Sequence, residues 1–301
     1  MNQFTGKHLI MACLAAVILP AFASYDAGRA AWLQGNYATA LKEFSADAAK
    51  GGIKSSNDLG VMYEKGQGVS VDYAQAMHFY RKAADKGFAP AQTSVGYLYQ
   101  EGLGVPKDYG QAMSWYNKAS GQNFAQAQNN IGAFYEKGYG VAADPAQAAE
   151  WYRKAADQGL ASGQTNLGYL YASGRGVNKD DVMAVSLYKK AAEQNFPLAQ
   201  NNLGYMTAEG RGVKQDFAAA ADWYRKAAER HFSLAEFNLA RLYEQGKGVQ
   251  QDNEQALSWF TQSANDGYKP AMRRLAQVYT QGLLGQHPDS ELARQWSDKA
   301  R

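Results

Sequence analysis

The sequence predicts an all-helical chain built from repeated helix pairs, and three observations carry that prediction. Marker residues recur every 36 residues along most of the 301-residue chain. Within each unit the apolar residues fall at helical spacing, as Ala91, Val95 and Leu98 do. An aspartate then stands at the same position of six units, where it can cap a second helix. Each unit is therefore predicted to be a helical hairpin, and consecutive hairpins are predicted to stack into a solenoid.

Residues 1–23 match the three zones of a secretory signal peptide. Lys7 precedes an apolar run from Leu9 to Leu19, which is followed by the small-residue site Ala21-Phe22-Ala23. A membrane anchor needs about 20 continuous apolar residues, whereas this run spans 11 residues and meets Pro20. We therefore expect cleavage after Ala23, a periplasmic or secreted protein, and no stable membrane span.

Cys13 is the only cysteine of the chain. Residues Ile10 to Cys13 resemble a lipoprotein processing site, so lipidation at Cys13 is an alternative to cleavage after Ala23. Cleavage after Ala23 would leave no cysteine, and hence no intramolecular disulfide and no thiolate metal site. The mature chain is then predicted to be stabilised by packing alone.

The charge balance predicts no nucleic-acid partner. The chain holds 31 Lys and Arg residues against 28 Asp and Glu residues. Removal of residues 1–23 removes one basic residue and no acidic one, which leaves 30 against 28 and a net charge of +2. A nucleic-acid-binding surface would require a basic excess that this chain lacks.

Residues 24–54 are predicted to form an atypical first hairpin. Asn36, Ala40, Phe44 and Ala48 keep register with the second half of a unit, but Gly35-Asn36 replaces the long turn. The segment resembles a tetratricopeptide hairpin and is expected to cap the N-terminal end of the solenoid.

Six full units follow, and each is expected to contain a helix A and a helix B. Their predicted bounds are 55–90, 91–126, 127–162, 163–198, 199–234 and 235–270. Glycine recurs within helix A as Gly60, Gly96, Gly132, Gly168 and Gly204. A glycine inside a helix costs about 1 kcal/mol relative to alanine. Five of them therefore imply that a neighbouring helix approaches too closely for a larger side chain.

Helix B carries start and stop signals. The capping aspartates are Asp72, Asp108, Asp144, Asp180, Asp216 and Asp252. Glutamine stands three residues later, as a capping box requires, at Gln75, Gln111, Gln147 and Gln255. Residue types that tolerate a left-handed backbone mark the expected end of helix B, at Gly87, Asn123, Gly159, Asn195, His231 and Gly267.

Residues 271–301 are predicted to form a divergent C-terminal capping repeat. Gly282-Leu283-Leu284-Gly285 carries one extra residue compared with the preceding turns, after which Asp289, Ala293 and Trp296 return to register. With the first hairpin, the sequence therefore predicts eight hairpins in all.

The repeated strings are Ala-Gln-x-x-Leu-Gly-x-x-Tyr, then Gly-x-Gly-Val-x-x-Asp, then Ala-x-x-Trp-Tyr-x-Lys-Ala-Ala. Residues Ala199 to Ala228 show them, except that Met206-Thr207 replaces the usual Leu/Met-Tyr pair. Over roughly residues 53 to 301 the chain resembles the Sel-1-like repeat, a relative of the tetratricopeptide repeat. The resemblance implies a right-handed superhelix of antiparallel helix pairs whose concave groove serves as an adaptor surface for proteins or peptides.

One polar series on helix A is a candidate for contact with a bound segment. It consists of Asn130, Asn166, Asn202 and Asn238. These positions project beside Tyr97, Tyr169 and Tyr205, away from the apolar stripe. The resemblance places helix A on the concave side, and asparagine amides can both donate to and accept from a peptide backbone. The alternative is that each asparagine bonds adjacent hairpins together, since buried polar groups need partners in either case.

Aromatic pairs and lysines also recur on helix B. The pairs are Phe79-Tyr80, Trp115-Tyr116, Trp151-Tyr152, Trp223-Tyr224 and Trp259-Phe260. They could form a stacking platform for bases or sugars, but the second ring of each pair lies on the apolar stripe, so burial of at least half of them is predicted. The lysines, expected to be solvated and to complement the helix dipole, are Lys82, Lys118, Lys154, Lys190 and Lys226.

No catalytic residue, metal ligand or cofactor site is predicted. The Gly-x-Gly turns lack the third glycine and the preceding strand of a dinucleotide fingerprint. His78, His231 and His287 are widely separated and have no zinc-site spacing. No Gly-x-Ser-x-Gly elbow occurs.

The favoured function is therefore a monomeric, exported adaptor that holds a protein or peptide in its groove. One alternative is the penicillin-binding or β-lactamase-like activity described for cysteine-rich secreted relatives, whose paired cysteines this chain lacks. Another is recognition of a cell-wall glycan or a host protein, because an exposed Tyr97 or Tyr205 could stack on sugars.

Overall fold

The computed structural model describes residues 25–301, so the predicted signal peptide lies outside the described residues. Within them the chain forms sixteen α-helices and no strand. Each odd-numbered helix packs against the even-numbered helix that follows it, from α1 with α2 to α15 with α16. These eight hairpins confirm the predicted fold class and the predicted number of pairs, with helix A odd-numbered and helix B even-numbered.

The helices divide between two compact units, one ending at Lys86 and one comprising Gly87–Arg301. Unit 1 contains α1 (Tyr25–Leu33), α2 (Tyr37–Ala49), α3 (Ile53–Lys65) and α4 (Tyr73–Ala84). Unit 2 begins with α5 (Ala89–Glu101), α6 (Tyr109–Ser120), α7 (Ala125–Lys137), α8 (Pro145–Asp157), α9 (Ala161–Ser173) and α10 (Asp181–Glu193). It continues with α11 (Pro197–Glu209), α12 (Phe217–Ala228), α13 (Ser233–Gln245), α14 (Asn253–Asn265), α15 (Lys269–Gln281) and α16 (Ser290–Lys299).

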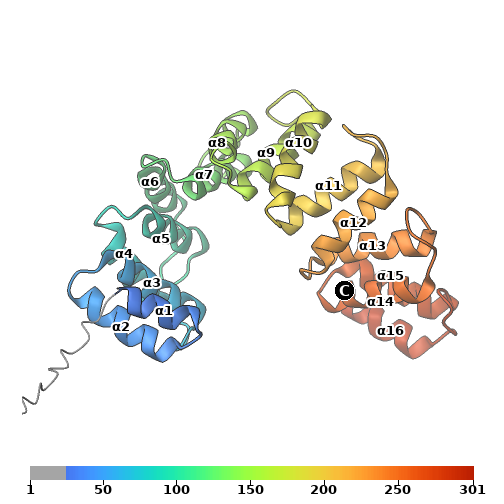
Figure 1. Cartoon of the computed structure of the whole chain (residues 1–301), viewed down its shortest axis with the longest axis horizontal. Helices are drawn as coiled ribbons and strands as arrows, with labels where there is room; N and C mark the ends of the chain where they lie inside the picture. Colours follow the sequence, from blue (N-terminus) through green and yellow to red (C-terminus); the bar gives the residue numbers. More distant parts are fainter. Residues whose placement is uncertain (1–24) are drawn as a thin grey trace, which may run out of the picture. The chain divides into compact units, whose positions relative to one another are not determined.

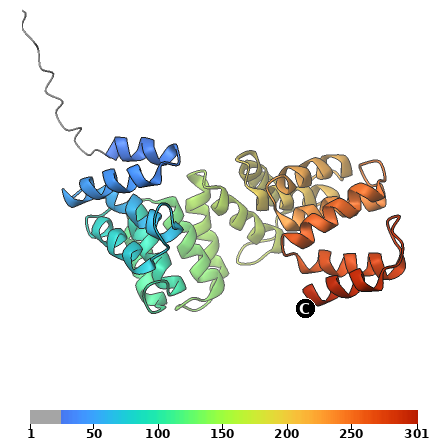
Figure 2. The same cartoon turned by 90° about the horizontal axis from the view of Figure 1, so that it is seen from below.

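Unit 2 is a row of stacked hairpins, which can be followed from α5 to α16 in Figures 1 and 2. Each helix B also packs against the helix A of the next hairpin, as α8 does against α9. None of the helices within residues 25–301 is both long and apolar enough to cross a membrane. The core is therefore a series of small clusters between successive helices, for example that of Ala184, Tyr188 and Leu203.

The predicted N-caps of helix B are confirmed at all six aspartates. The Asp72 carboxylate accepts from the backbone N–H of Gln75 at 2.9 Å, and the other five accept in the same way. The second hydrogen bond of a capping box, in which the glutamine side chain accepts from the backbone N–H of the aspartate, does not form. That N–H donates instead to a helix A carbonyl, as from Asp72 to Tyr63 at 2.9 Å and from Asp108 to Tyr99 at 2.9 Å. The hairpin itself supplies the acceptor, so the glutamine has no donor left to satisfy.

The predicted left-handed residues at the end of helix B are also confirmed. Their φ values are positive throughout, at 87° for Gly87, 60° for Asn123 and 57° for His231. The chain turns sharply at this residue, which lets the next helix A fold back against helix B.

The repeated helix A glycines face an aromatic ring of helix B. A Cβ atom on Gly96 would lie 2.7 Å from the ring of Tyr116, and one on any of the other four glycines would lie 2.5–2.9 Å from its ring. This confirms the predicted close approach. In the first hairpin, whose turn is shorter, Gly28 of helix A faces the ring of Phe44 of helix B in the same way.

The second ring of each aromatic pair is buried, which confirms the packing prediction. Tyr80, Tyr116 and Tyr152 are at most 1% exposed. Their hydroxyl groups donate to an acid or amide at the end of helix A, as Tyr116 does to Gln100 at 2.8 Å. The hydroxyl of each tyrosine thus gains a partner without leaving the core.

The repeated lysines do more than complement the helix dipole. The Nζ atoms of Lys118 and Lys154 lie 3.7 and 3.8 Å from the ring centroids of Trp115 and Trp151. The first ring of these pairs therefore supports a cation–π contact with the lysine one turn later.

Candidate peptide-binding surface

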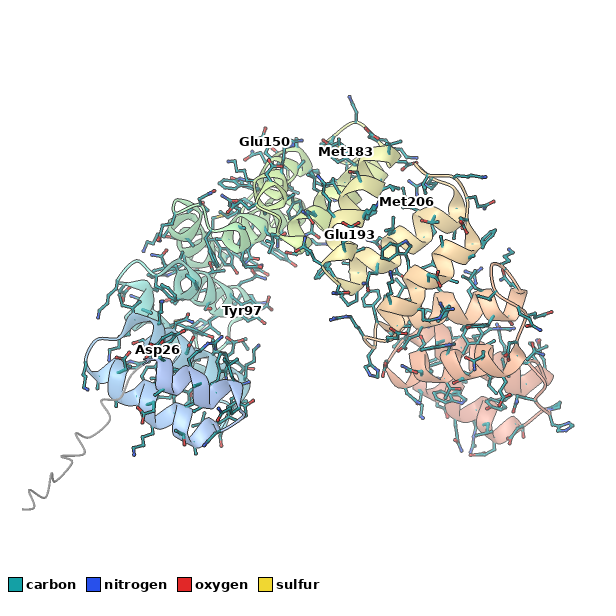
Figure 3. All side chains as sticks on the ribbon, viewed as in Figure 1. Asp26, Tyr97, Glu150, Met183, Glu193 and Met206 are labelled. Carbon is teal, nitrogen blue, oxygen red and sulfur yellow. The ribbon has the colours of Figure 1, made fainter. Side chains whose placement is uncertain are left out.

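The three candidate tyrosines project from the A helices into solvent. Tyr97 of α5, Tyr169 of α9 and Tyr205 of α11 are 40, 46 and 46% exposed, whereas the neighbouring Leu170 and Met206 are at most 1% exposed. Figure 3 shows Tyr97 on the inner side of the curve that unit 2 follows and Glu150 of α8 on its outer side. Exposed aromatic rings on three A helices of unit 2 are suited to contact with a bound chain.

A pocket of about 340 Å³ opens between α9 and α11, and we call it the Tyr169 pocket. It is lined by Tyr169, Ser173, Tyr188, Asn202, Tyr205 and Arg211, together with Ala172 and Met206. Its volume is at the lower end of the range for ligand pockets, about 300–1,000 Å³. It is therefore large enough for one or two side chains of a bound segment.

Arg211 is held rigidly at the wall of this pocket. Its guanidinium donates to both carboxylate oxygens of Asp181, at 2.6 and 3.2 Å, and to the carbonyl of Ala172 at 2.9 Å. The hydrogen bonds from Arg211 hold the pKa of Asp181 below its usual value, and the positive charge adds to that effect. The pocket thus has a cation whose side chain is already ordered before any partner binds.

A second pocket of about 150 Å³ adjoins the first, and we call it the Arg241 pocket. It is lined by residues of α11, α12, α13 and the turn after α13, among them Tyr205, Glu209, Asn238, Arg241, Gln245 and Lys247. Tyr205 lines both pockets and so forms their common wall. Two cations, Arg241 and Lys247, outnumber the single carboxylate of Glu209 there.

The asparagine series was predicted either to contact a bound segment or to bond adjacent hairpins together, and its members show features of both. The side-chain amide of Asn166 donates to Asn129 Oδ1 at 3.0 Å, and that of Asn238 donates to Asn201 Oδ1 at 2.9 Å. Both bonds join A helices of consecutive repeats, as the inter-hairpin alternative expects. Asn202 and Asn238 nevertheless line the pockets, and both are half-buried.

The two pockets bring together four of the seven candidate residues, Tyr169, Tyr205, Asn202 and Asn238. Tyr97 and Asn130 line neither pocket, and Asn130 accepts from Gln126 of its own helix at 3.0 Å. Asn166 likewise lies outside the two linings.

Sequence reasoning missed the basic residues of the pockets. Arg211 and Lys247 occupy the variable position of the Gly-x-Gly turn, which was interpreted only as a turn. A comparison of that one position across the repeats was the available signal, since it also holds Arg175.

One Ser-x-x-Lys string, the first element of a β-lactamase-like site, is present at Ser186 to Lys189 in α10. Both residues are exposed, and neither lines the Tyr169 pocket or the Arg241 pocket. Ser186 and Lys189 therefore lie on an open surface and not in either of the two pockets described above.

A family model described as the Sel1 repeat matches seven consecutive segments of the chain. They are 53–88, 89–124, 125–160, 161–196, 197–232, 233–268 and 269–301. The chain belongs to the Sel1 repeat family. In this family the repeat commonly serves as a scaffold for contacts between proteins.

Two solved structures are similar to this Sel1 repeat protein in sequence and fold. A Sel1 repeat protein from Oxalobacter formigenes is 36% identical with a TM-score of 0.73, and the match covers 82% of this chain and 96% of that one. A protective antigen of uropathogenic Escherichia coli with the same repeat fold is 34% identical with a TM-score of 0.69. The match covers 92% of this chain but spans only 60% of that antigen's length.

An immunity protein of Pseudomonas aeruginosa is 22% identical with a TM-score of 0.51, over 69% of this chain and 81% of that one, and so shows the fold alone. A search of curated proteins found no match.

Proposed function

We propose that this Sel1 repeat protein is an exported scaffold without catalytic activity of its own, which binds an extended segment of a partner protein on the A helices of unit 2. One observation supports this above the others: the Tyr169 and Arg241 pockets adjoin across Tyr205. A continuous chain could therefore contact both pockets and the exposed ring between them.

The lining residues suggest the chemistry of the bound segment. An apolar side chain suits the Tyr169 pocket, where two exposed tyrosine rings offer contact area at low conformational cost. A carboxylate on the segment suits the basic groups Arg211, Arg241 and Lys247. Asn202 can bond the backbone of the segment without selecting its side chains.

Export is part of this proposal, and it rests on the signal-peptide pattern of residues 1–23. Mass spectrometry of the protein recovered from its native cell envelope would test it. We expect a mature N-terminus at Ser24. A chain that keeps residues 1–23, or that carries a lipid on Cys13, would contradict cleavage after Ala23.

The binding surface can be tested by crosslinking in the native envelope, identification of the captured partner, and titration of its contacting segment with purified variants. Substitution of Tyr205→Ala together with Arg241→Ala should weaken binding by about tenfold or more, as loss of central aromatic and arginine contacts does. The midpoint of thermal unfolding should change little, because Tyr205 is 46% exposed.

Val182→Ala is the matched control, since Val182 of α10 is 67% exposed and lines neither pocket. Equal loss in both variants, or unchanged binding in the double variant, would count against this surface. Capture of a cell-wall glycan in place of a protein would favour the alternative of glycan recognition.

A further inference from the structure

Pairs of glutamines join the two helices of one hairpin in three repeats of unit 2, and the helix A member of each pair is buried. The side-chain amide of Gln122 donates to Gln92 at 2.8 Å, that of Gln158 to Gln128 at 2.7 Å, and that of Gln194 to Gln164 at 3.0 Å. In each pair the two residues are 30 positions apart, one at the end of helix B and one buried on helix A. An amide carries both donors and an acceptor, so such a pair is self-complementary.

At one of these pairs an asparagine of the preceding repeat completes the arrangement and so joins the two repeats. Asn123 Oδ1 accepts from Gln128 at 3.0 Å and from Gln158 at 3.2 Å. These three residues, which we call the amide triad, join the loop before α7, helix α7 itself and the residue that ends α8.

Three repeats later the same positions hold His231, Glu236 and Asp266. All three amides are thus replaced by side chains that can bind a metal ion. Neither carboxylate can donate a hydrogen bond while it is ionised, so the bonds of the amide triad cannot form here.

The substituted positions leave a buried oxygen without a partner. Glu236 is fully buried, and its Oε1 atom accepts from Gln262 at 2.8 Å. Its Oε2 atom has no hydrogen-bond partner among the described residues. Burial makes a negative charge on this unpartnered oxygen unfavourable, and the carboxylate of Asp266 lies close by.

The donor atoms are grouped closely enough to share one ion. One ligand atom from each of His231, Glu236 and Asp266 lies within 4.8 Å of the other two. His231 Nδ1 and Asp266 Oδ2 are 3.3 Å apart. Two ligands of a tetrahedral zinc ion, with bonds of about 2.0–2.1 Å, are separated by about 3.3 Å.

We propose that His231, Glu236 and Asp266 bind one divalent transition metal ion of the zinc class, in the place of an amide triad. The imidazole favours such an ion over magnesium or calcium, which prefer oxygen ligands alone. His231 and Asp266 have side chains that are 75 and 30% exposed, so the ion could enter from solvent and keep an open coordination position. A bound ion would join the loop before α13 to the end of α14.

The test uses the purified, tag-free chain after treatment with a chelator, and zinc chloride as the probe. Equilibrium dialysis with elemental analysis should give one zinc ion per chain. Zinc should also raise the midpoint of thermal unfolding, because an ion bound by the folded state alone stabilises it. Absence of stoichiometric zinc binding would overturn the proposal.

The chain supplies its own matched variant. His231→Asn, Glu236→Gln and Asp266→Gln together would recreate the amide triad of Asn123, Gln128 and Gln158 and should fold without zinc. This triple variant should lose both the bound ion and the thermal shift. Zinc binding that survives in it unchanged would place the ion elsewhere and reject the site.

Two single variants complete the design. His231→Asn changes an exposed residue to a type that already occupies this left-handed position as Asn123, and it should weaken zinc binding by about tenfold or more. His287→Asn removes a histidine outside the cluster and should leave zinc binding unchanged. The reverse pattern would assign zinc to His287 and exclude the proposed site.

Discussion

At the scale of single residues, the distance between helix A and helix B within a hairpin depends on a missing Cβ atom. Gly60, Gly96, Gly132, Gly168 and Gly204 each face a tyrosine ring of helix B. Where alanine takes this position at Ala240, the facing ring is the smaller Phe260, in the same core cluster. The close approach of the two helices therefore depends on which pair of residues meets at this point.

The substitution Gly132→Ala should destabilise the protein. Its Cβ atom would lie 2.7 Å from the ring of Tyr152. Overpacking costs about 1–3 kcal/mol, and the better helix propensity of alanine offsets up to about 1 kcal/mol. Urea unfolding should thus show a net loss of up to about 3 kcal/mol. The control Gly110→Ala, which meets only Asp108 Oδ1 at 3.3 Å, should be neutral or stabilising; equal losses would contradict the steric explanation.

At the scale of helices, a backbone bond joins helix A and helix B at the long turn of every hairpin after the first. The cap residue of helix B accepts from its own helix through its carboxylate and donates its N–H to helix A, as Asp144 does to Tyr135 at 2.8 Å. The end of the turn is thereby fixed to both helices. The pairs Asn166–Asn129 and Asn238–Asn201 then join A helices of consecutive repeats.

The ion pair of Asp181 and Arg211 joins two elements 30 positions apart, the first residue of α10 and the turn after α11. The pKa of Asp181 is lowered in the folded state. Its contribution to stability is therefore full above the unfolded pKa and is lost as the pH falls through the lower folded pKa. Asp181→Asn should cost about 0.5–1 kcal/mol at pH 7.

That cost should shrink toward zero as the pH falls below about 4, the usual aspartate pKa. Parallel chemical unfolding of both proteins at pH 7 and pH 3 would measure it. A difference that is the same at both pH values would mean that the ion pair does not contribute. High salt should reduce the difference at pH 7 as well.

At the scale of the whole molecule, contacts run between near neighbours in the chain of helices. Within each unit, helices pack on the next helix and, more weakly, on the next but one, as α7 does on α9. Stability in such a solenoid is approximately a sum over repeats and their interfaces. Damage to one hairpin should therefore stay local.

Leu275→Ala tests this locality. Leu275 of α15 is fully buried, and removal of a buried leucine side chain costs about 2–5 kcal/mol. Hydrogen exchange followed by mass spectrometry should show faster exchange in α14 to α16 and no change in α5 to α7. Faster exchange along all of unit 2 would instead show that it unfolds as one cooperative body.

The sequence alone determined the helical fold, the number of hairpins, the caps of helix B and the residues that end it. Each of these depends on periodicity or on residues three or four positions apart, so the signal is local. Only the tertiary structure decided which residues meet across repeats. The pairing of Arg211 with the Tyr169 pocket, and of His231 with Asp266, depends on how each hairpin is rotated against the next. Packing of side chains sets that rotation, and no spacing within a single repeat records it.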